Sequence, residues 1–354
     1  MFKAELELLE PARLSSRQTK KGFTIYSRLF IPGGTLRGAI ITALMERGGV
    51  DVKAEAANPS IRCEPLYFVG SDGRPFYGPF TYRHKLTREV REVEVDELMK
   101  ALREVIEENR LTPLRELPLL DPEYERYMGL QGEGAEAWVS AHVAMSKRYR
   151  KAYKGLLYSY VCLTEGSKFT GLVHDSGSLL SEDVMDIRIG GAVSRGFGRA
   201  TLKLSKESEE SKTQLVREWL EESRFELNSR SYLCLIARSP IAYFKNPFEV
   251  CPYIPRISGR DWKAEIVSIE GKVVVLGNYV EVGGWSYLTG VHKPQFNAGS
   301  PGTLLLYRVT NWRKAREELV EKCLHGFDEL SAIGFNYLTP LITGGKPRRW
   351  LLLD

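Results

Sequence analysis

The chain has 354 residues, of which 43% are hydrophobic and 27% are charged, and its formal net charge is +5. This length gives room for two domains that each bury a core, and the composition excludes a disordered or collagen-like chain. No stretch approaches the roughly 18 consecutive apolar residues of a membrane helix. The N-terminal sequence MFKAELELLE lacks the basic start and apolar core of a signal peptide, so we expect a cytoplasmic protein with no membrane contact.

The first 50 residues predict a strand, a long loop and a helix. Residues 2–8 alternate between apolar and charged side chains, which is typical of a half-buried antiparallel strand. In IPGGTLRGAIITALMERGG, the residues after the Pro-Gly-Gly turn are apolar at helical spacing, with Thr35 as the expected N-cap and Gly48 near the end. A strand, a crossing loop and a helix begin a ferredoxin-like β-α-β-β-α-β unit.

The rest of the chain predicts an insertion, a linker and a second domain. Residues 86–136 hold fourteen acidic against seven basic side chains and read as an acidic helical insertion. Residues 205–228 are highly charged and are expected to form a linker, part of it helical. The order of strands and helix in 229–354 loosely repeats that in 1–204. We therefore predict an α+β chain with two tandem ferredoxin-like (RRM-like) domains, the second one degenerate.

Basic residues are concentrated in tracts that contain no Asp or Glu. Residues 11–45, 187–206, 282–316 and 330–353 are all free of acid, and they coincide with glycine-rich segments. A chain that sorts its charge in this way presents basic faces to a polyanion despite a moderate net charge. The alternative is chance variation in loop composition.

The segment GGAVSRGFGR (190–199) interleaves four glycines with two arginines. Glycine lets a backbone approach a phosphate closely, and arginine adds a planar fork of donors. The P-loop pattern is excluded, because Phe197 and Gly198 stand where Lys and Ser/Thr are needed. The dinucleotide fingerprint is excluded as well, because Thr201 replaces its third glycine. The alternative is a hairpin in which the glycines only permit tight turns.

A second candidate is SKRYRKAYKGLLYSY (146–160), in which five basic residues are interleaved with four tyrosines. Nucleic-acid bases stack on aromatic rings while the cations follow the phosphates, so this run is a candidate RNA contact. The alternative is an exposed strand whose tyrosines pack inward.

The combination of IPGGTLRG (31–38) and GGAVSRGFGR (190–199) resembles the two signature segments of the CRISPR-associated RAMP superfamily. GGWSYLTGVHKPQFNAGSPGTLLLY (283–307) is similar to a run in the subfamily of type III-D effectors that caps the five-prime handle of the guide RNA. GFDELSAIGFNYLTPL (326–341) looks like a degenerate second glycine-rich loop, in which Asn336 departs from the usual small or basic residue.

This resemblance implies a non-catalytic RNA-binding subunit of a type III effector complex that grips the guide RNA's five-prime handle at one end. The implied partners are guide RNA, RAMP backbone subunits and a polymerase-like large subunit, with target RNA contacted indirectly. The positions that we expect to contact RNA are Lys20, Lys21, Arg37, Lys147, Arg148, Arg150, Lys151, Gly190, Gly191, Arg195, Gly196, Phe197, Gly198, Arg199 and Lys293.

The sequence argues against catalysis, a cofactor and a metal. RAMP relatives that process guide RNA place a general-base histidine near the first helix, but here no histidine precedes His84. Relatives that cut target RNA use an aspartate ahead of the Pro-Gly turn, and residues 15–30 contain no acid. His142 and His174 leave an endoribonuclease open as an alternative. A protein–protein adaptor without RNA contact is the other.

Overall fold

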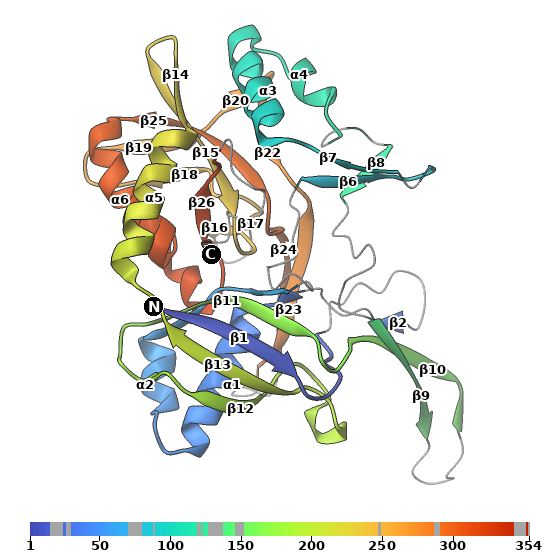
Figure 1. Ribbon diagram of the computed structural model, residues 1–354. Helices are drawn as coiled ribbons and strands as arrows, with labels where there is room; N and C mark the ends of the chain where they lie inside the picture. Colours follow the sequence, from blue (N-terminus) through green and yellow to red (C-terminus); the bar gives the residue numbers. More distant parts are fainter. Residues whose placement is uncertain are drawn as a thin grey trace.

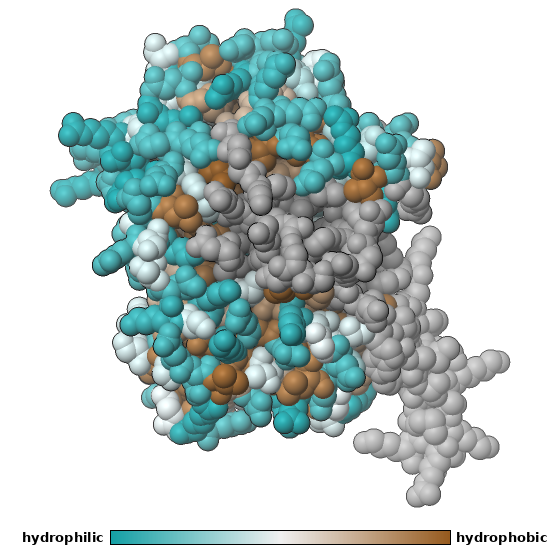
Figure 2. Space-filling view, viewed as in Figure 1, coloured by the Kyte–Doolittle hydropathy of each residue, from teal (hydrophilic) through white to brown (hydrophobic). Residues whose placement is uncertain are grey.

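The computed structural model describes residues 1–14, 24–25, 30–69, 80–87, 89–118, 121, 123–126, 137–145, 152–246, 249–286, 291–342 and 352, with only the backbone for 24–25, 81, 125–126, 137–145, 152–160, 284–286 and 291–294. The chain is a mixed α+β protein with two main antiparallel sheets, one from each half (Figure 1). On the face seen in Figure 2, the coloured hydrophobic residues form small, separated patches. Among the described residues, no helix is long and apolar enough to cross a membrane.

The first half contains the first sheet and the insertion. Its elements are β1 (Phe2–Leu8), β2 (Thr24–Ile25), β3 (Phe30–Ile31), α1 (Gly33–Glu46), α2 (Val52–Ala57), β4 (Ile61–Cys63), β5 (Leu66–Phe68), β6 (Thr81–His84), β7 (Val90–Glu92), α3 (Val95–Glu108), α4 (Thr112–Arg115), β8 (Tyr124–Arg126), β9 (Ala137–Met145), β10 (Ala152–Leu163), β11 (Lys168–Asp175), β12 (Val184–Arg188), the 3-10 turn η1 (Val193–Arg195) and β13 (Arg199–Lys206).

The second half contains the second sheet, two long helices and several hairpins. Its elements are α5 (Glu209–Ser223), β14 (Arg224–Leu227), β15 (Arg230–Ala237), β16 (Tyr243–Asn246), β17 (Glu249–Cys251), β18 (Arg256–Ser258), β19 (Lys263–Ile266), β20 (Ser268–Ile269), β21 (Lys272–Val273), β22 (Val275–Leu276), β23 (Tyr279–Ser286), β24 (Val291–Gly299), β25 (Leu304–Thr310), α6 (Trp312–His325), the 3-10 turn η2 (Glu329–Ile333) and β26 (Leu338–Pro340).

The first sheet has the strand order β12-β13-β1-β11-β5-β3, with β4 also paired to β11. The alternation in β1 is confirmed, because its apolar face is buried in one core with the inner face of α1. Helix α1 begins three residues earlier than predicted, at Gly33, with Pro32 rather than Thr35 at the N-cap position. Proline suits a helix start, where its missing N–H would have no partner within the helix.

The stretch between β11 and β13 differs from a β-α-β-β-α-β unit. All of residues 176–198 are described, and they contain the edge strand β12 and the single turn η1 in place of a second long helix. Strand β12 pairs antiparallel with β13, so a hairpin ends the sheet on this side. The glycine-rich loop is the connection of that hairpin.

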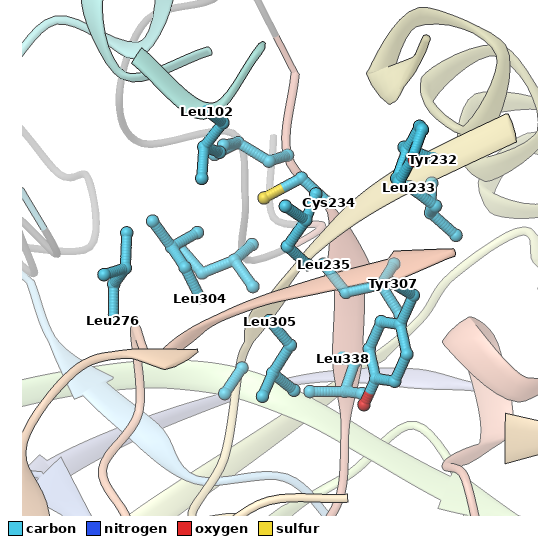
Figure 3. Close-up of a cluster of buried hydrophobic side chains, with 14 of the residues drawn as sticks. Leu102, Tyr232, Leu233, Cys234, Leu235, Leu276, Leu304, Leu305, Tyr307 and Leu338 are labelled. Carbon is cyan, nitrogen blue, oxygen red and sulfur yellow. The ribbon is translucent and has the colours of Figure 1, made fainter. Parts of the chain in front are cut away.

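The second sheet has the order β14-β15-β25-β19-β18, with β26 also paired to β15. Helices α5 and α6 pack against each other, and both contact strand β26 of this sheet. On the other side, Leu102 of α3 lies near Cys234, Leu276 and Leu304 (Figure 3). Because both faces are covered, Leu233–Ala237 are all buried. The insertion predicted near 86–136 therefore packs one side of its helix into the second core.

The segment 205–228, which the sequence suggested as a linker, belongs to the second half from Glu209 onward. It contains the end of β13, all of α5 and all of β14. Helix α5 buries Val216, Trp219 and Leu220 in the second core, at the spacing of one helical face. The sequence prediction missed this apolar face because charged side chains fill the solvent-exposed positions of the same helix.

Candidate nucleic-acid interface

The glycine-rich loop is fixed by close backbone contacts at two of its four glycines. Gly190 has a φ of 79° and Gly198 a φ of 81°, a conformation that side chains disfavour. A Cβ at Gly190 would collide with the carbonyl of Arg13, and one at Gly198 with the carbonyl of Ile189. These two glycines therefore shape the loop and hold it against the chain, rather than presenting a surface to a ligand.

The other two glycines border the exposed tip. A Cβ at Gly191 or at Gly196 would meet nothing within 4 Å. Ser194, Arg195 and Gly196 are all exposed. Arg195 was predicted to contact RNA. Its side chain is in solvent at the end of the first sheet, where a polyanion has access.

Phe197, in contrast, lies inside the molecule. Its side chain is 7% exposed and packs with Cys162 and Ala192 in a small cluster. In this position the ring anchors the loop on the C-terminal end of β10. It does not offer a face on which a nucleobase could stack. The prediction that Phe197 contacts RNA is replaced by this packing role.

The hairpin places two arginines opposite each other next to the loop. Arg188 of β12 pairs directly with Arg199 of β13, and both residues are exposed. Like charges directly opposite on an antiparallel pair are unfavourable. Asp186 offsets one of them, at 3.8 Å from the Arg199 guanidinium. An anion between the two guanidinium groups would relieve the remaining repulsion, so Arg188 joins the candidate interface. In the sequence, Arg188 stands out only as part of the acid-free residues 187–206. The pairing of β12 with β13 was needed to show that it faces Arg199.

Three segments that lie far apart in the sequence meet beside this loop. Arg13 forms an isolated bridge with Gly191, and Ala12 forms one with Leu163 at the end of β10. Strand β2 pairs with β10, where Thr24 lies opposite Ser159 (Figure 1). Residues 12–13, the end of β10 at Leu163 and the glycine-rich loop are therefore neighbours in space.

Six of the predicted RNA contacts, in residues 11–45 and 146–160, lie outside the described residues. They are Lys20, Lys21, Lys147, Arg148, Arg150 and Lys151. Lys293 lies in β24, close to its register partner Gly284, and only its backbone is described.

Arg37 has a structural role. Its Nε donates to the carbonyl of Ile61 at 2.7 Å, and an Nη donates to the Glu55 side chain at 2.9 Å. Burial raises the pKa of Glu55, but hydrogen bonds from Ser60, Ile61 and Arg37 outweigh it, so the net pKa is lowered. Arg37 thus ties α1 to α2 and β4, and its guanidinium is not available to RNA.

The two remaining glycine motifs form a joint between the halves. Gly33 at the start of α1 packs against Gly334, where an added Cβ would lie 2.7 Å from the Gly33 Cα atom. Asn336 is buried and bonds to Ala242 through both its amide oxygen and its amide nitrogen. Asn336 therefore has a structural role within the second half, and Gly334, two residues earlier, packs against the first half.

A buried ionic network lies at the same joint. One Arg238 nitrogen donates to both carboxylate oxygens of Glu64, at 2.7 and 2.6 Å. His174 lies 3.1 Å from Glu64 and stacks on Tyr337 with ring centroids 5.6 Å apart. Burial lowers the pKa of His174, and the Arg238 and His325 charges lower it further, against the opposing effect of Glu64. His142, the other catalytic candidate, is described by its backbone alone.

On the exposed part of the first sheet, two glutamates compensate most of the charge of three lysines. Lys3 and Lys203 both pair with Glu5, and Lys168 pairs with Glu7. Only one positive charge is left over in this set, so its attraction for phosphates is weak. The concentration of positive charge is at the end of the sheet, around the glycine-rich loop. Within the described residues, no group of three metal-ligating side chains comes together.

Comparison with known proteins gives a structural likeness only. No protein-family model matches the chain, and no curated protein matches its sequence. A chain from the structure of the type III-B Cmr-β complex bound to cognate target RNA is 13% identical, with 96% of each chain covered and a TM-score of 0.50. A chain from a second structure of that complex, with target RNA and AMPPnP, is 14% identical, with 96% of each chain covered and a TM-score of 0.49.

Cmr4 (Cas7) from Pyrococcus furiosus is 12% identical, with 58% of this chain and 99% of that chain covered and a TM-score of 0.26. At such identities the likeness concerns the fold, and the match at 0.50 carries it. The chain thus resembles, over almost its whole length, a chain from a type III-B Cmr complex structure.

Proposed function

We propose that this chain is a non-catalytic, RNA-binding subunit of a type III CRISPR effector ribonucleoprotein. The fold likeness to a chain from an RNA-bound Cmr complex supports membership of such an assembly. The observation that carries RNA binding is the glycine-rich loop, where Arg195 is exposed and Arg188 faces Arg199 across the hairpin. Positive charge that is unbalanced and accessible beside a turn suits the phosphates of a nucleic acid.

We further propose that both halves are ferredoxin-like (RRM-like) domains, each of them modified. In the first sheet β1 and β11 are central, with β13 outside one and β4 with β5 outside the other. In the second, β15 and β25 are central, with β26 and β19 outside. Both orders agree with a β-α-β-β-α-β unit. The first half keeps the helix after its first strand, and the second keeps α6 before its last.

A salt series on three loop arginines tests RNA binding. We expect the R188A/R195A/R199A variant to bind a single-stranded guide RNA more weakly, since three phosphate contacts are lost. The log–log dependence of affinity on salt should become shallower by about 2, at about 0.7 per phosphate. These side chains are exposed, so the folded state should persist.

The matched control is K3A/K168A/K203A, which removes three lysines that are paired with Glu5 and Glu7 on the first sheet. Its RNA affinity should stay close to that of the parent chain. If the arginine variant keeps the parent affinity and slope, the loop is not the interface. If the parent chain has no salt-dependent RNA affinity at all, the adaptor alternative holds.

We propose that the RNA bound is the five-prime handle of the guide, at one end of the complex. Support comes from the unequal halves: the first presents an open glycine-rich loop, whereas the second has its loop covered at the joint. A repeating filament subunit needs one repeating RNA surface. A photocrosslinker at position 195 should react with handle nucleotides only, and crosslinks at regular intervals along the spacer would indicate a backbone subunit instead.

The proposal that the chain is not an enzyme has its own test. His174 is 6% exposed and held by Glu64 and Tyr337 at the joint, an arrangement that favours a structural role. Purified protein should leave guide and target RNA intact with and without divalent metal. Cleavage that disappears in a His142→Ala or His174→Ala variant would support the endoribonuclease alternative.

A further inference from the structure

A cluster of three cations lies on the second sheet, at strands β18, β19 and β25. Arg256 and Lys263 approach one oxygen of Glu265, at 2.7 and 3.4 Å, and Arg308 approaches the other at 3.6 Å. The cation side chains are between 45% and 62% exposed. Hydrogen bonds from Lys263 and Arg256 lower the pKa of Glu265, so it is ionised at neutral pH. Three cations and one anion leave two positive charges without a counter-ion inside the cluster.

The sheet register arranges these residues as a row. Arg256 pairs with Glu265, and Glu265 pairs with Arg308 on the next strand. Adjacent strands are about 4.8 Å apart, so the backbones of the two arginines are held roughly 10 Å from each other. Both guanidinium groups are exposed and gathered on one carboxylate, so they can also donate hydrogen bonds to carboxylates of a partner.

Strand β18 is the edge of this sheet. Among the described residues it pairs only with β19, on one side. Arg256 and Ser258 are exposed along it, while Ile257 is buried. An unpaired edge offers backbone N–H and C=O groups to another extended chain.

We propose that this edge and its basic row form a docking site for an extended, acidic protein segment of a partner. The segment would add a strand beside β18 and direct its carboxylates at Arg256 and Arg308. Two observations favour a peptide over RNA. The edge supplies backbone hydrogen bonds that only a polypeptide can pair in register, and the aromatic pair that continues the row, Phe225 and Tyr232, is buried. Single-stranded RNA sites combine cations with accessible rings.

The site is separate from the glycine-rich loop. Figure 1 shows β18 and β19 in the second half and the β12–β13 hairpin at the far side of the first half. Binding at the two places can therefore be measured independently, and the docking proposal does not depend on RNA binding.

Fluorescence anisotropy with two defined probes tests the proposal on the full chain. The first probe is a labelled decapeptide of five Glu-Thr repeats, in which every second residue is acidic. The second is a single-stranded RNA of ten nucleotides. In R256Q/R308Q we expect peptide affinity to fall about tenfold, at roughly threefold for each exposed ion pair lost, with RNA affinity unchanged. K168Q/K203Q, an equal charge change on the first sheet, should leave peptide affinity unchanged.

The Glu265→Gln variant gives a result that a merely structural cluster would not. It removes the central anion and raises the net charge of the row, so peptide affinity should rise about threefold. The proposal is overturned if the parent chain does not bind the peptide, or if R256Q/R308Q binds it as the parent does. It is also overturned if those variants weaken RNA binding and spare the peptide, since the row would then belong to an RNA path.

Discussion

The ion pair between Glu64 and Arg238 is the contact whose loss we expect to destabilise the chain most. Arg238 is 0% exposed and Glu64 is 4% exposed, and Arg238 also donates to the carbonyl of Cys323 on α6. Replacing Arg238 by Leu leaves the Glu64 charge buried without its main partner. Breaking a buried pair in this way costs about 3–5 kcal/mol. The double variant E64L/R238L removes both charges and should recover roughly 2 kcal/mol of that loss.

Guanidinium unfolding, followed by far-UV circular dichroism and tryptophan fluorescence, measures these free energies by linear extrapolation. The matched control is K245L, which breaks an exposed pair with Glu249 at 2.6 Å and should cost no more than about 1 kcal/mol. Because α3 of the first half also packs into the second core, the two probes should still give coincident transitions in R238L, as two-state extrapolation requires. A cost below about 1 kcal/mol in R238L, or simple additivity in the double variant, would refute this account of the joint.

Three further predictions concern the same fold. Gly334→Ala should destabilise the chain by more than the about 1–2 kcal/mol that a left-handed alanine costs, because the new Cβ would also lie 2.7 Å from the Gly33 Cα atom of the first half. The control is Gly48→Ala, where φ is 72° and the surrounding space is open. In thermal unfolding, the control should show the backbone cost alone. Leu102→Ala should cost about 2–5 kcal/mol by chemical denaturation, since its side chain is 1% exposed, whereas the exposed Lys100→Ala should be nearly neutral. Because the pKa of His174 is lowered in the folded chain, the unfolded chain takes up a proton near pH 6.5 and the folded chain does not. The contribution of His174 to stability should be full above that pH and fall by up to about 1.4 kcal/mol per pH unit below it. A His174→Gln variant that keeps the same slope between pH 7 and 5 would contradict this.

The local elements of the fold could be predicted from the sequence, because their signals lie within a few residues. The period of two in residues 2–8 predicted the strand β1, and the glycines after an apolar run at helical spacing predicted the end of α1. The loop at 190–199 was recognisable as a turn with accessible arginine, since glycine spacing and charge are local properties. Arg195 is exposed there, in agreement with that interpretation.

The partners of each side chain were decided only by the tertiary structure. Arg37 and Arg195 are both arginines beside glycines, yet one is held by Glu55 and the other is in solvent. Phe197 is buried because β10, more than 30 positions earlier in the chain, passes beneath it. The charged segment 205–228 became a core helix because one narrow stripe meets the second sheet. A sequence states which side chains are available and with what period, but burial and pairing depend on residues far along the chain, and these come together only when the sheets form.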